Sequence, residues 1–184
     1  MGRGPLAGPI VAAAVTLKQV RFKNCIRDSK KLSHHQRERA FLEIMNKSIF
    51  GLGVMSESVI DALNIQEANR MAMENAVNNL VEKIKRIKQT KIKNAHIHVL
   101  IDGNIKLNLK FPVTHIIKGD NKSKSIACAS IIAKVLRDRM MDLYDKIYPA
   151  YGFQKHKGYP TRLHRTRLKR LGPTPIHRRS FTYA

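Results

Sequence analysis

Apolar and polar positions along the chain follow two kinds of pattern, which predict strands that alternate with helices. Residues 10–17 form a continuous, partly β-branched apolar run that is typical of a buried strand. Ser33 and Gln36 then fit a helix-capping box, and residues 34–48 predict a helix. A short strand is expected near residues 49–55, so the first part of the chain predicts strand, helix and strand.

The longest helical pattern begins near Asn64, after a cap-rich stretch at residues 56–58 that also leads into helical sequence. Apolar residues spaced by three and four define one helix face: Ile65, Ala68, Ala72, Ala76, Leu80, Ile84 and Ile87. The lysine-rich residues 83–93 predict a solvated helix end and a loop.

Two short apolar runs follow, at residues 97–101 and 113–117, and both predict strands. The first leads directly into Asp102, and Asp120 comes soon after the second. Carboxylates at strand ends could bind Mg²⁺ or Mn²⁺, which prefer oxygen ligands. The alternative is structural: Asp102 precedes a glycine, as in a turn, and Asp120 could cap the segment that follows.

The rest of the chain predicts one long helix and then mainly loops. The helical pattern runs from residue 126 to residue 147 and is closed by Pro149. Beyond it we expect loops and one short helix. The length of 184 residues fits one domain, 1–184. The alternation of elements predicts an α/β or α+β fold with one sheet flanked by helices.

Charge indicates the kind of partner. The chain has 35 Lys and Arg against 13 Asp and Glu, a formal net charge of +22, which favours a nucleic acid over the other polyanionic candidate, an anionic membrane surface. No apolar run approaches the ~18 residues of a membrane span. The basic C-terminal segment, 146–184, contains no Asp or Glu.

Aromatic residues are interleaved with the basic residues of this segment: Tyr151, Phe153, Tyr159, Phe181 and Tyr183. Basic side chains neutralise phosphates and aromatic rings contact sugars or bases, so the segment predicts a nucleic-acid surface. The alternative is a solvated basic face whose aromatic rings lie in the core.

Cysteine use predicts a reducing compartment, and therefore a cytoplasmic protein. Cys25 and Cys128 make no disulfide framework, and both are expected to pack as small hydrophobic residues. The apolar run near the N-terminus resembles a signal peptide only loosely, because it is short and follows a stretch rich in Gly and Pro. A buried strand is the favoured interpretation of that run.

Seven motifs, taken in order, resemble those of bacterial ribonuclease HII. They are GRGPLAGP at 2–9, DSKKLS at 28–33, LIDGN at 100–104, KGD at 118–120, SIACASIIAKVLRDR at 125–139, YPAYGFQKHKGYPT at 148–161 and GPTPIHRRSF at 172–181. The resemblance implies a ribonuclease H-like fold, a mixed five-stranded sheet flanked by helices with a C-terminal helical extension. It also implies a monomeric endonuclease that hydrolyses the RNA strand of RNA–DNA hybrids and nicks DNA duplexes at embedded ribonucleotides.

The resemblance assigns roles to particular residues. Asp102 and Asp120 match two of the family's four catalytic carboxylates and are expected to bind Mn²⁺ or Mg²⁺, in a reaction where two ions activate water and stabilise the leaving oxygen. Gly2-Arg3-Gly4 matches the loop that reads the ribonucleotide 2′-hydroxyl, and Tyr159 matches the residue that packs on the nucleotide at the RNA–DNA junction. Asp138 is expected to form a helix salt bridge to a nearby Arg.

One departure affects the expected activity. The family places an Asp-Glu pair on a strand just before the segment that starts here at Gly2, whereas no two of the 13 acidic residues in this chain are adjacent. We expect an in-frame upstream extension that encodes this strand. Two alternatives remain: a catalytically impaired nucleic-acid-binding remnant of the same scaffold, and a basic ribosome-associated protein that is supported only by charge.

Overall fold

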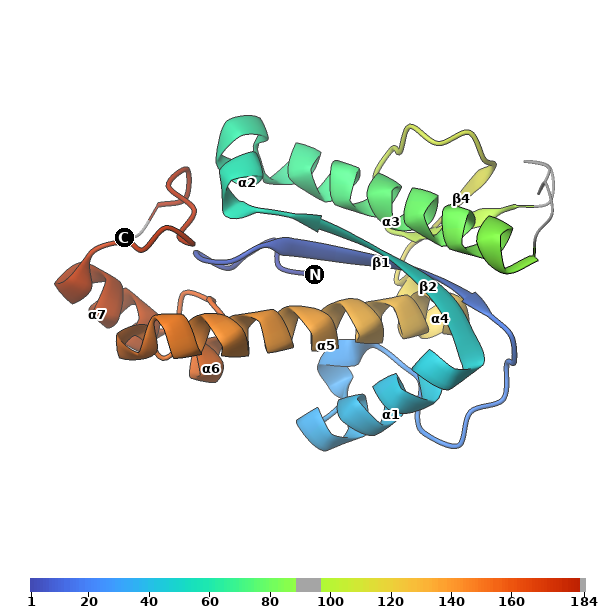
Figure 1. The fold of residues 1–184 in the computed structure, drawn as a ribbon, viewed down its shortest axis with the longest axis horizontal. Helices are drawn as coiled ribbons and strands as arrows, with labels where there is room; N and C mark the ends of the chain where they lie inside the picture. Colours follow the sequence, from blue (N-terminus) through green and yellow to red (C-terminus); the bar gives the residue numbers. More distant parts are fainter. Residues whose placement is uncertain (89–96, 183–184) are drawn as a thin grey trace.

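The computed structural model describes residues 1–88 and 97–182, and its centre is an antiparallel pair of strands (Figure 1). Strand β1, Ile10–Leu17, pairs with β2, Ser48–Met55, so that Ile10 lies opposite Met55 and Leu17 opposite Ser48. Side chains alternate between the two faces of a strand. β1 therefore contributes to two apolar cores, one on each side of the pair.

On one face, helix α3, Ile65–Lys88, lies directly against β2. The helix presents small residues there, Ala68, Ala72 and Ala76, all essentially fully buried. A Cβ atom at Gly53 would lie 1.9 Å from the Ala72 carbonyl oxygen, and one at Gly51 would lie 2.2 Å from that of Ala76. The two strand glycines are therefore needed for the close approach of this helix.

The other face is covered by helices α1, His34–Lys47, and α5, Lys124–Ile147. Their apolar side chains form a core with the second set of β1 residues: Leu32, Ala40, Phe41, Ile44, Cys128, Ile131, Ile132 and Val135, against Ala13, Val15 and Leu17. Ser33 and Gln36 form the predicted capping box of α1. The predicted order strand, helix, strand is confirmed.

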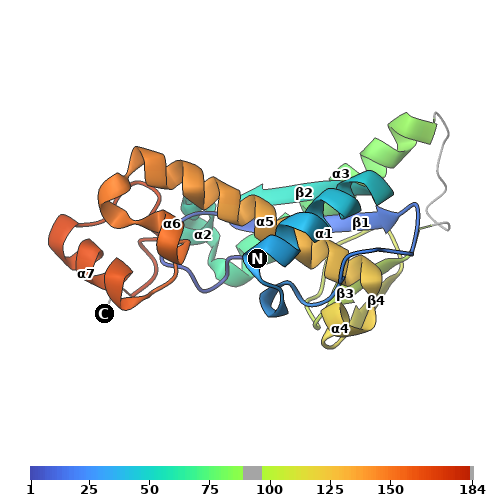
Figure 2. The same ribbon diagram turned by 90° about the horizontal axis from the view of Figure 1, so that it is seen from below.

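The remaining strands differ from the single sheet that we predicted. Strand β3, Val99–Asp102, pairs in parallel with β4, Val113–Ile116, and in the described part of the chain this pair and the β1–β2 pair form two separate sheets. The physical reason is that no described strand lies between β1 and β3 to continue the ladder. Figure 2 shows β3, β4 and the short helix α4, Gly119–Lys122, grouped together beside α5.

Most predicted elements are confirmed with small changes at their ends. Asn64 caps α3 through its side chain, and the cap-rich stretch before it starts α2, Glu57–Leu63. The first of the two later strands begins at Val99 rather than at residue 97. Residues 89–93 of the predicted solvated segment lie outside the described residues.

The C-terminal segment contains more helix than we predicted. It forms a 3-10 turn, Pro149–Tyr151, then α6, Phe153–His156, and α7, Arg162–Leu171. These elements lie at one end of the molecule (Figure 2). They were missed because Gly, Pro and basic residues interrupt the apolar pattern, while Thr161 caps α7 through its side chain.

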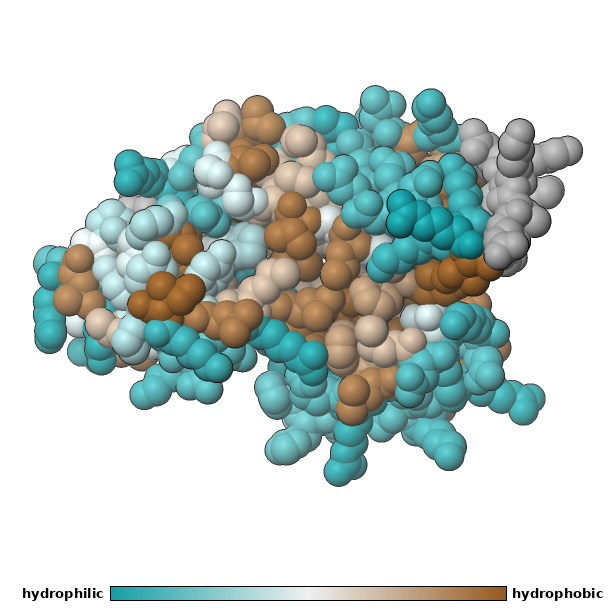
Figure 3. Space-filling view, in the orientation of Figure 1, coloured by the Kyte–Doolittle hydropathy of each residue, from teal (hydrophilic) through white to brown (hydrophobic). Residues whose placement is uncertain are grey.

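Apolar and polar residues occupy different regions of one face of the molecule. Figure 3 shows an apolar band across the middle of the face seen in Figure 1, between hydrophilic side chains above and below it. Cys128 is buried as predicted, but Cys25 is exposed, because it lies in the polar connection after β1 and not on an element packed against a core. Within residues 1–88 and 97–182, no helix is long and apolar enough to cross a membrane.

Candidate active site

The parallel pairing of β3 and β4 brings the two predicted carboxylates to the same edge of a sheet. Asp102 is the last residue of β3, opposite Ile116, and Asp120 lies in the first turn of α4, directly after β4. The Gly119 N–H donates a 2.8 Å hydrogen bond to Oδ1 of Asp102, which ties the two segments together. Parallel strands present their carboxyl ends at one edge, so the sequence placed these two residues correctly.

A third carboxylate, Asp28, lies near enough to act electrostatically on Asp120, and sequence reasoning did not single it out. The pKa of Asp120 is raised, first by burial and then by the negative charges of Asp28 and Asp102. Asp28 caps the 3-10 turn Ser29–Lys31, where its Oδ1 accepts the Lys30 N–H at 2.9 Å. The signal was present in the DSKKLS motif, but a lone Asp in a polar connection does not reveal which strand end it faces.

These carboxylates fit a divalent cation in part. Burial raises the pKa of Asp120 most, repulsion from Asp28 and Asp102 adds to the shift, and a nearby cation would relieve that repulsion. Their hard oxygen atoms suit Mg²⁺ or Mn²⁺. However, the described residues contain no group of three or more His, Cys, Asp or Glu arranged closely enough to hold a metal ion. Within the described residues, Asp102 and Asp120 are therefore not accompanied by enough ligands to hold a metal ion.

Arg178 holds the predicted Gly2-Arg3-Gly4 loop through hydrogen bonds to its backbone. This guanidinium is fully buried and donates to the carbonyl oxygens of Gly2 at 2.7 Å, Arg3 at 3.1 Å and Gly8 at 2.8 Å. The backbone N–H of Arg178 also donates to the Leu6 carbonyl at 2.9 Å. The C-terminal segment thus fixes the path of the loop at the opposite end of the chain.

Gly2 and Gly4 lie in different surroundings within the loop. Gly2 has φ +90°, and a Cβ atom on it would lie 2.3 Å from Nε of Arg137, so both backbone and packing require glycine. Gly4 is exposed, and a Cβ atom there would meet nothing within 4 Å. The protein itself leaves open space beside Gly4, and a ligand that approaches the backbone closely would use that space.

Tyr159 lies beside this loop. The Leu6 N–H donates to the Gly158 carbonyl at 2.8 Å, and the Tyr159 ring is half-buried, with its centroid 5.9 Å from the Arg137 guanidinium. All four predicted nucleic-acid-binding residues, Gly2, Arg3, Gly4 and Tyr159, are therefore brought together, although they are separated by more than 150 positions in the sequence.

Two observations relate the Gly2-Arg3-Gly4 loop to the segments that carry Asp102 and Asp120. Arg3 and Asn104, which follows Asp102 by two residues, line one cavity of about 430 Å³ together with Asn64, Gln66, Glu67, Arg70 and Ile105. In addition, the positive charge of Lys30 acts on the Asp120 carboxyl and on the amino group at Met1, next to Gly2. The cavity therefore joins the loop to the segment that follows Asp102, although neither Asp102 nor Asp120 lines it.

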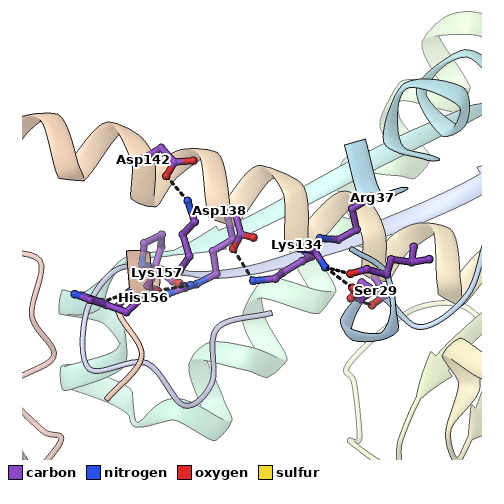
Figure 4. A network of polar contacts seen from close by, with 12 residues as sticks. Ser29, Arg37, Lys134, Asp138, Asp142, His156 and Lys157 are labelled. Atoms are coloured by element: carbon purple, nitrogen blue, oxygen red, sulfur yellow. Dashed lines mark hydrogen bonds and ion pairs between the residues drawn. The ribbon is translucent and has the colours of Figure 1, made fainter. Parts of the chain in front are cut away.

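Two predictions about other residues are wrong. Asp138 pairs with Lys134 at 2.7 Å and not with an arginine, because Lys134 lies one helical turn earlier on the same face of α5 (Figure 4). Tyr151 and Phe153 are buried and stacked in the C-terminal core, so the alternative interpretation, aromatic rings in the core, holds for these two. Phe181 packs against two cores, and Tyr183 lies outside the described residues.

A buried histidine cluster supports the Tyr159 loop. His156 and His164 stack at 4.3 Å, Nε2 of His164 lies 3.0 Å from Nε2 of His177, and Nδ1 of His164 hydrogen-bonds the Tyr159 carbonyl at 2.9 Å. Burial, followed by smaller effects that include neighbouring histidines, lowers the pKa of both His164 and His177 to about 4.

This cluster should make the fold acid-sensitive. Unfolded histidines titrate near pH 6.5, so between about pH 6.5 and 4 the unfolded chain binds more protons than the folded one, and stability falls as pH decreases. We expect each of the two histidines to contribute a loss on the order of 2 kcal/mol between pH 7 and pH 5. Thermal melts at pH 7 and pH 5 measure this loss of stability. His164→Gln should reduce the difference between the two melting temperatures, whereas His34→Gln, at an exposed position, should not. Equal melting temperatures at both pH values would contradict this account.

Together, the described features define an α/β protein with two carboxylates at one sheet edge and a glycine-containing loop that lies beside Tyr159. The ribonuclease HII family model matches residues 1–184. Ribonuclease HII from Lactobacillus helveticus is 48% identical over 183 residues, which cover 98% of this chain and 68% of the relative. Ribonuclease HII from Caldicellulosiruptor bescii is also 48% identical and is covered to 82%.

Solved structures agree with this match. The structure of the PCNA:RNase HII complex from Archaeoglobus fulgidus gives a TM-score of 0.73 at 25% identity, over 99% of this chain and 92% of the other. Ribonuclease H2 from Pyrococcus horikoshii gives 0.68 at 27% identity, over 100% and 92%. This chain belongs to the ribonuclease HII family, the type 2 ribonuclease H endonucleases, and has their ribonuclease H-like fold.

Proposed function

We propose that this endonuclease hydrolyses the RNA strand of RNA–DNA hybrids and nicks DNA duplexes at embedded ribonucleotides, with Asp102 and Asp120 as ligands of Mn²⁺ or Mg²⁺. The observation that carries the proposal is the meeting of Asp102 and Asp120 at one sheet edge, linked by the Gly119 hydrogen bond. When bound, a divalent cation supplies charge that activates water and stabilises the leaving oxygen of a phosphodiester.

Different residues of the chain would contact the sugar, the base and the phosphates around that site. The open space beside Gly4 suits close approach of a sugar, and backbone groups of residues 2–4 would hydrogen-bond its 2′-hydroxyl, the group that separates RNA from DNA. Tyr159 would pack on the sugar or base next to it. Arg3 and Lys30 would hold the phosphates that flank the cleaved bond.

Metal removal tests this function directly. An RNA–DNA hybrid should be cleaved in the presence of Mn²⁺ or Mg²⁺ and left intact after chelation with EDTA, while the matching all-DNA duplex should stay intact in both cases. Cleavage of the hybrid that persists in EDTA would contradict the role given to Asp102 and Asp120.

One observation favours the alternative of a catalytically impaired nucleic-acid-binding protein. The carboxylates of the described residues do not complete a cation site, and no two acidic residues of the chain are adjacent. A chain with these properties would still bind nucleic acid through its basic surface. Cleavage separates the two proposals, since the impaired protein would bind the same duplex without nicking it.

Binding should depend strongly on salt, because the basic C-terminal segment presents several exposed cations: Lys146, Lys155, Arg162, Arg165, Lys169, Arg170 and Arg179. Each phosphate neutralised by such a side chain releases a counterion. We expect duplex affinity to fall roughly tenfold or more between about 50 and 200 mM salt, measured by fluorescence anisotropy.

A matched pair of variants tests which cations contribute. The double variant Arg165→Gln, Lys169→Gln on α7 should flatten the salt dependence, whereas Arg39→Gln, Arg86→Gln, which removes two exposed cations from α1 and α3, should leave it unchanged. A flat titration of the unmodified chain would contradict binding through this surface. We further infer a monomer. We also infer a cytoplasmic location, which the scarcity of cysteine supports.

A further inference from the structure

Arg137 lies near the middle of α5 and is 1% exposed, although arginine is among the residues that are rarely buried. Its three donor nitrogens are all used, and all of them bond backbone carbonyl oxygens. Nε donates to Pro9 at 3.0 Å, Nη2 to Ala7 at 3.1 Å and Nη1 to Lys157 at 2.9 Å. The first two carbonyls belong to the loop that begins with Gly2, and the third belongs to the loop that carries Tyr159.

The two loops also pack tightly against this side chain and against each other. A Cβ atom on Gly2 would lie 2.3 Å from Nε of Arg137, so the loop runs directly over the guanidinium. A Cβ atom on Gly158 would lie 2.5 Å from the Ala7 carbonyl oxygen, which itself accepts from Arg137. The Tyr159 ring lies 5.9 Å from the same guanidinium, within the range of a cation–π contact.

We propose that Arg137 is a positioning residue for ribonucleotide recognition, because it fixes the Gly2-Arg3-Gly4 loop and the Tyr159 loop relative to each other. The inference rests on the proposed function, which assigns the 2′-hydroxyl to the first loop and the adjoining nucleotide to the second. Arg137 does not touch the substrate. It sets the spacing at which both loops meet one nucleotide, and Arg178 also supports the first loop through its hydrogen bonds to the Gly2 and Arg3 carbonyl oxygens.

The guanidinium group is suited to this task by its shape. Its nitrogens lie in one plane and point in fixed, divergent directions, so a single side chain bonds three carbonyls on two segments. A lysine at this position would keep the positive charge, but its compact ammonium group could not reproduce the planar fork. Neighbouring contacts on α5 hold the second loop as well, since Lys157 pairs with Asp142 (Figure 4).

The test compares affinity for a duplex that carries one ribonucleotide with affinity for the same duplex made entirely of DNA, in EDTA so that cleavage is suppressed. Arg137→Lys should lower this preference roughly tenfold, mainly through weaker binding of the ribonucleotide duplex. Arg139→Lys is the matched control, because Arg139 lies two residues further along α5, is half exposed and pairs with Glu38 on the surface. Melting temperatures are recorded for each variant, and binding is measured well below the lowest of them.

The outcomes separate this inference from the proposed function. A folded Arg137→Lys variant that keeps the full preference overturns the positioning role while the proposed function stands. No preference in the unmodified chain overturns both. A loss of stability without a positioning role would weaken binding of both duplexes equally and would leave their ratio unchanged, which also counts against the inference.

A second measurement uses the unmodified protein and does not depend on the folding of a variant. With ¹⁵N-labelled arginine, the Nε–H resonance of Arg137 should shift on addition of the single-ribonucleotide duplex and respond less to the all-DNA duplex. The Arg139 resonance should not distinguish the two. An Arg137 resonance that responds equally to both duplexes would contradict the proposal.

Discussion

A version of this chain preceded by a strand that ends in Asp-Glu is expected to cleave a single-ribonucleotide duplex at least about a hundredfold faster than residues 1–184 alone. The carboxylates of the described residues leave a cation site incomplete, and two further acids beside Asp102 and Asp120 would add the missing ligand charge. A hundredfold change corresponds to only about 2.7 kcal/mol of transition-state stabilisation.

The structure also shows where such a strand would lie. Met1 and Val11 are paired by two backbone hydrogen bonds beside β1. The Met1 amino group donates to the Val11 carbonyl at 2.6 Å, and the Val11 N–H donates to the Met1 carbonyl at 2.9 Å. We expect residues added before Met1 to continue this ladder along β1, and pairing of their other edge with β3 would join the two sheets. The added strand would then hold Asp102 more firmly, so that geometry and charge both favour the longer chain.

A matched extension separates these contributions. The same added strand ending in Asn-Gln supplies the ladder without the charge and should recover stability, measured by melting temperature, but little of the rate. Equal single-turnover rates for residues 1–184 and for the Asp-Glu version would show that the added acids are dispensable and would contradict this account.

Asp102→Asn is expected to lower the single-turnover rate of the extended chain by at least about a hundredfold. The substitution is nearly isosteric, and the Asn carbonyl oxygen can still accept the Gly119 N–H that Oδ1 accepts in the unmodified protein. Fold and loop position should therefore be kept, while the negative charge that binds a cation is lost.

Glu82→Gln is the control for this substitution. Glu82 is an exposed carboxylate on α3 that pairs only with neighbouring Lys85, so its loss should change neither rate nor stability measurably. Full activity of Asp102→Asn with unchanged stability would remove Asp102 from the catalytic site.

The sequence predicted the local elements well where pattern and caps agreed. The capping box at Ser33 and the alanine face of α3 both specify their helices within a few residues. Asp102 and Asp120 were also placed correctly, because each carboxylate follows a short apolar strand closely and the two strands are parallel.

Long-range features could not be predicted from pattern. The contribution of Asp28 to the Asp120 site depends on how the loop before α1 folds back over α4, and no local signal fixes that path. The same holds for Arg137 and Arg178, which are buried and bind a loop more than a hundred residues away, although arginine is typical of solvated positions. Their partners are backbone carbonyls, which every residue type provides and which therefore leave no trace in the sequence.

The central claim, that Asp102 and Asp120 belong to an endonuclease site that recognises a ribonucleotide, is tested most directly by mapping where the extended chain cuts a duplex carrying one ribonucleotide. With Mn²⁺ or Mg²⁺ present, we expect a single nick at the ribonucleotide that leaves 5′-phosphate and 3′-hydroxyl ends, and no cutting of the matching all-DNA duplex. Asp120→Asn should abolish the nick. Cutting that ignores the ribonucleotide, or a nick that survives Asp120→Asn unchanged, would contradict the claim.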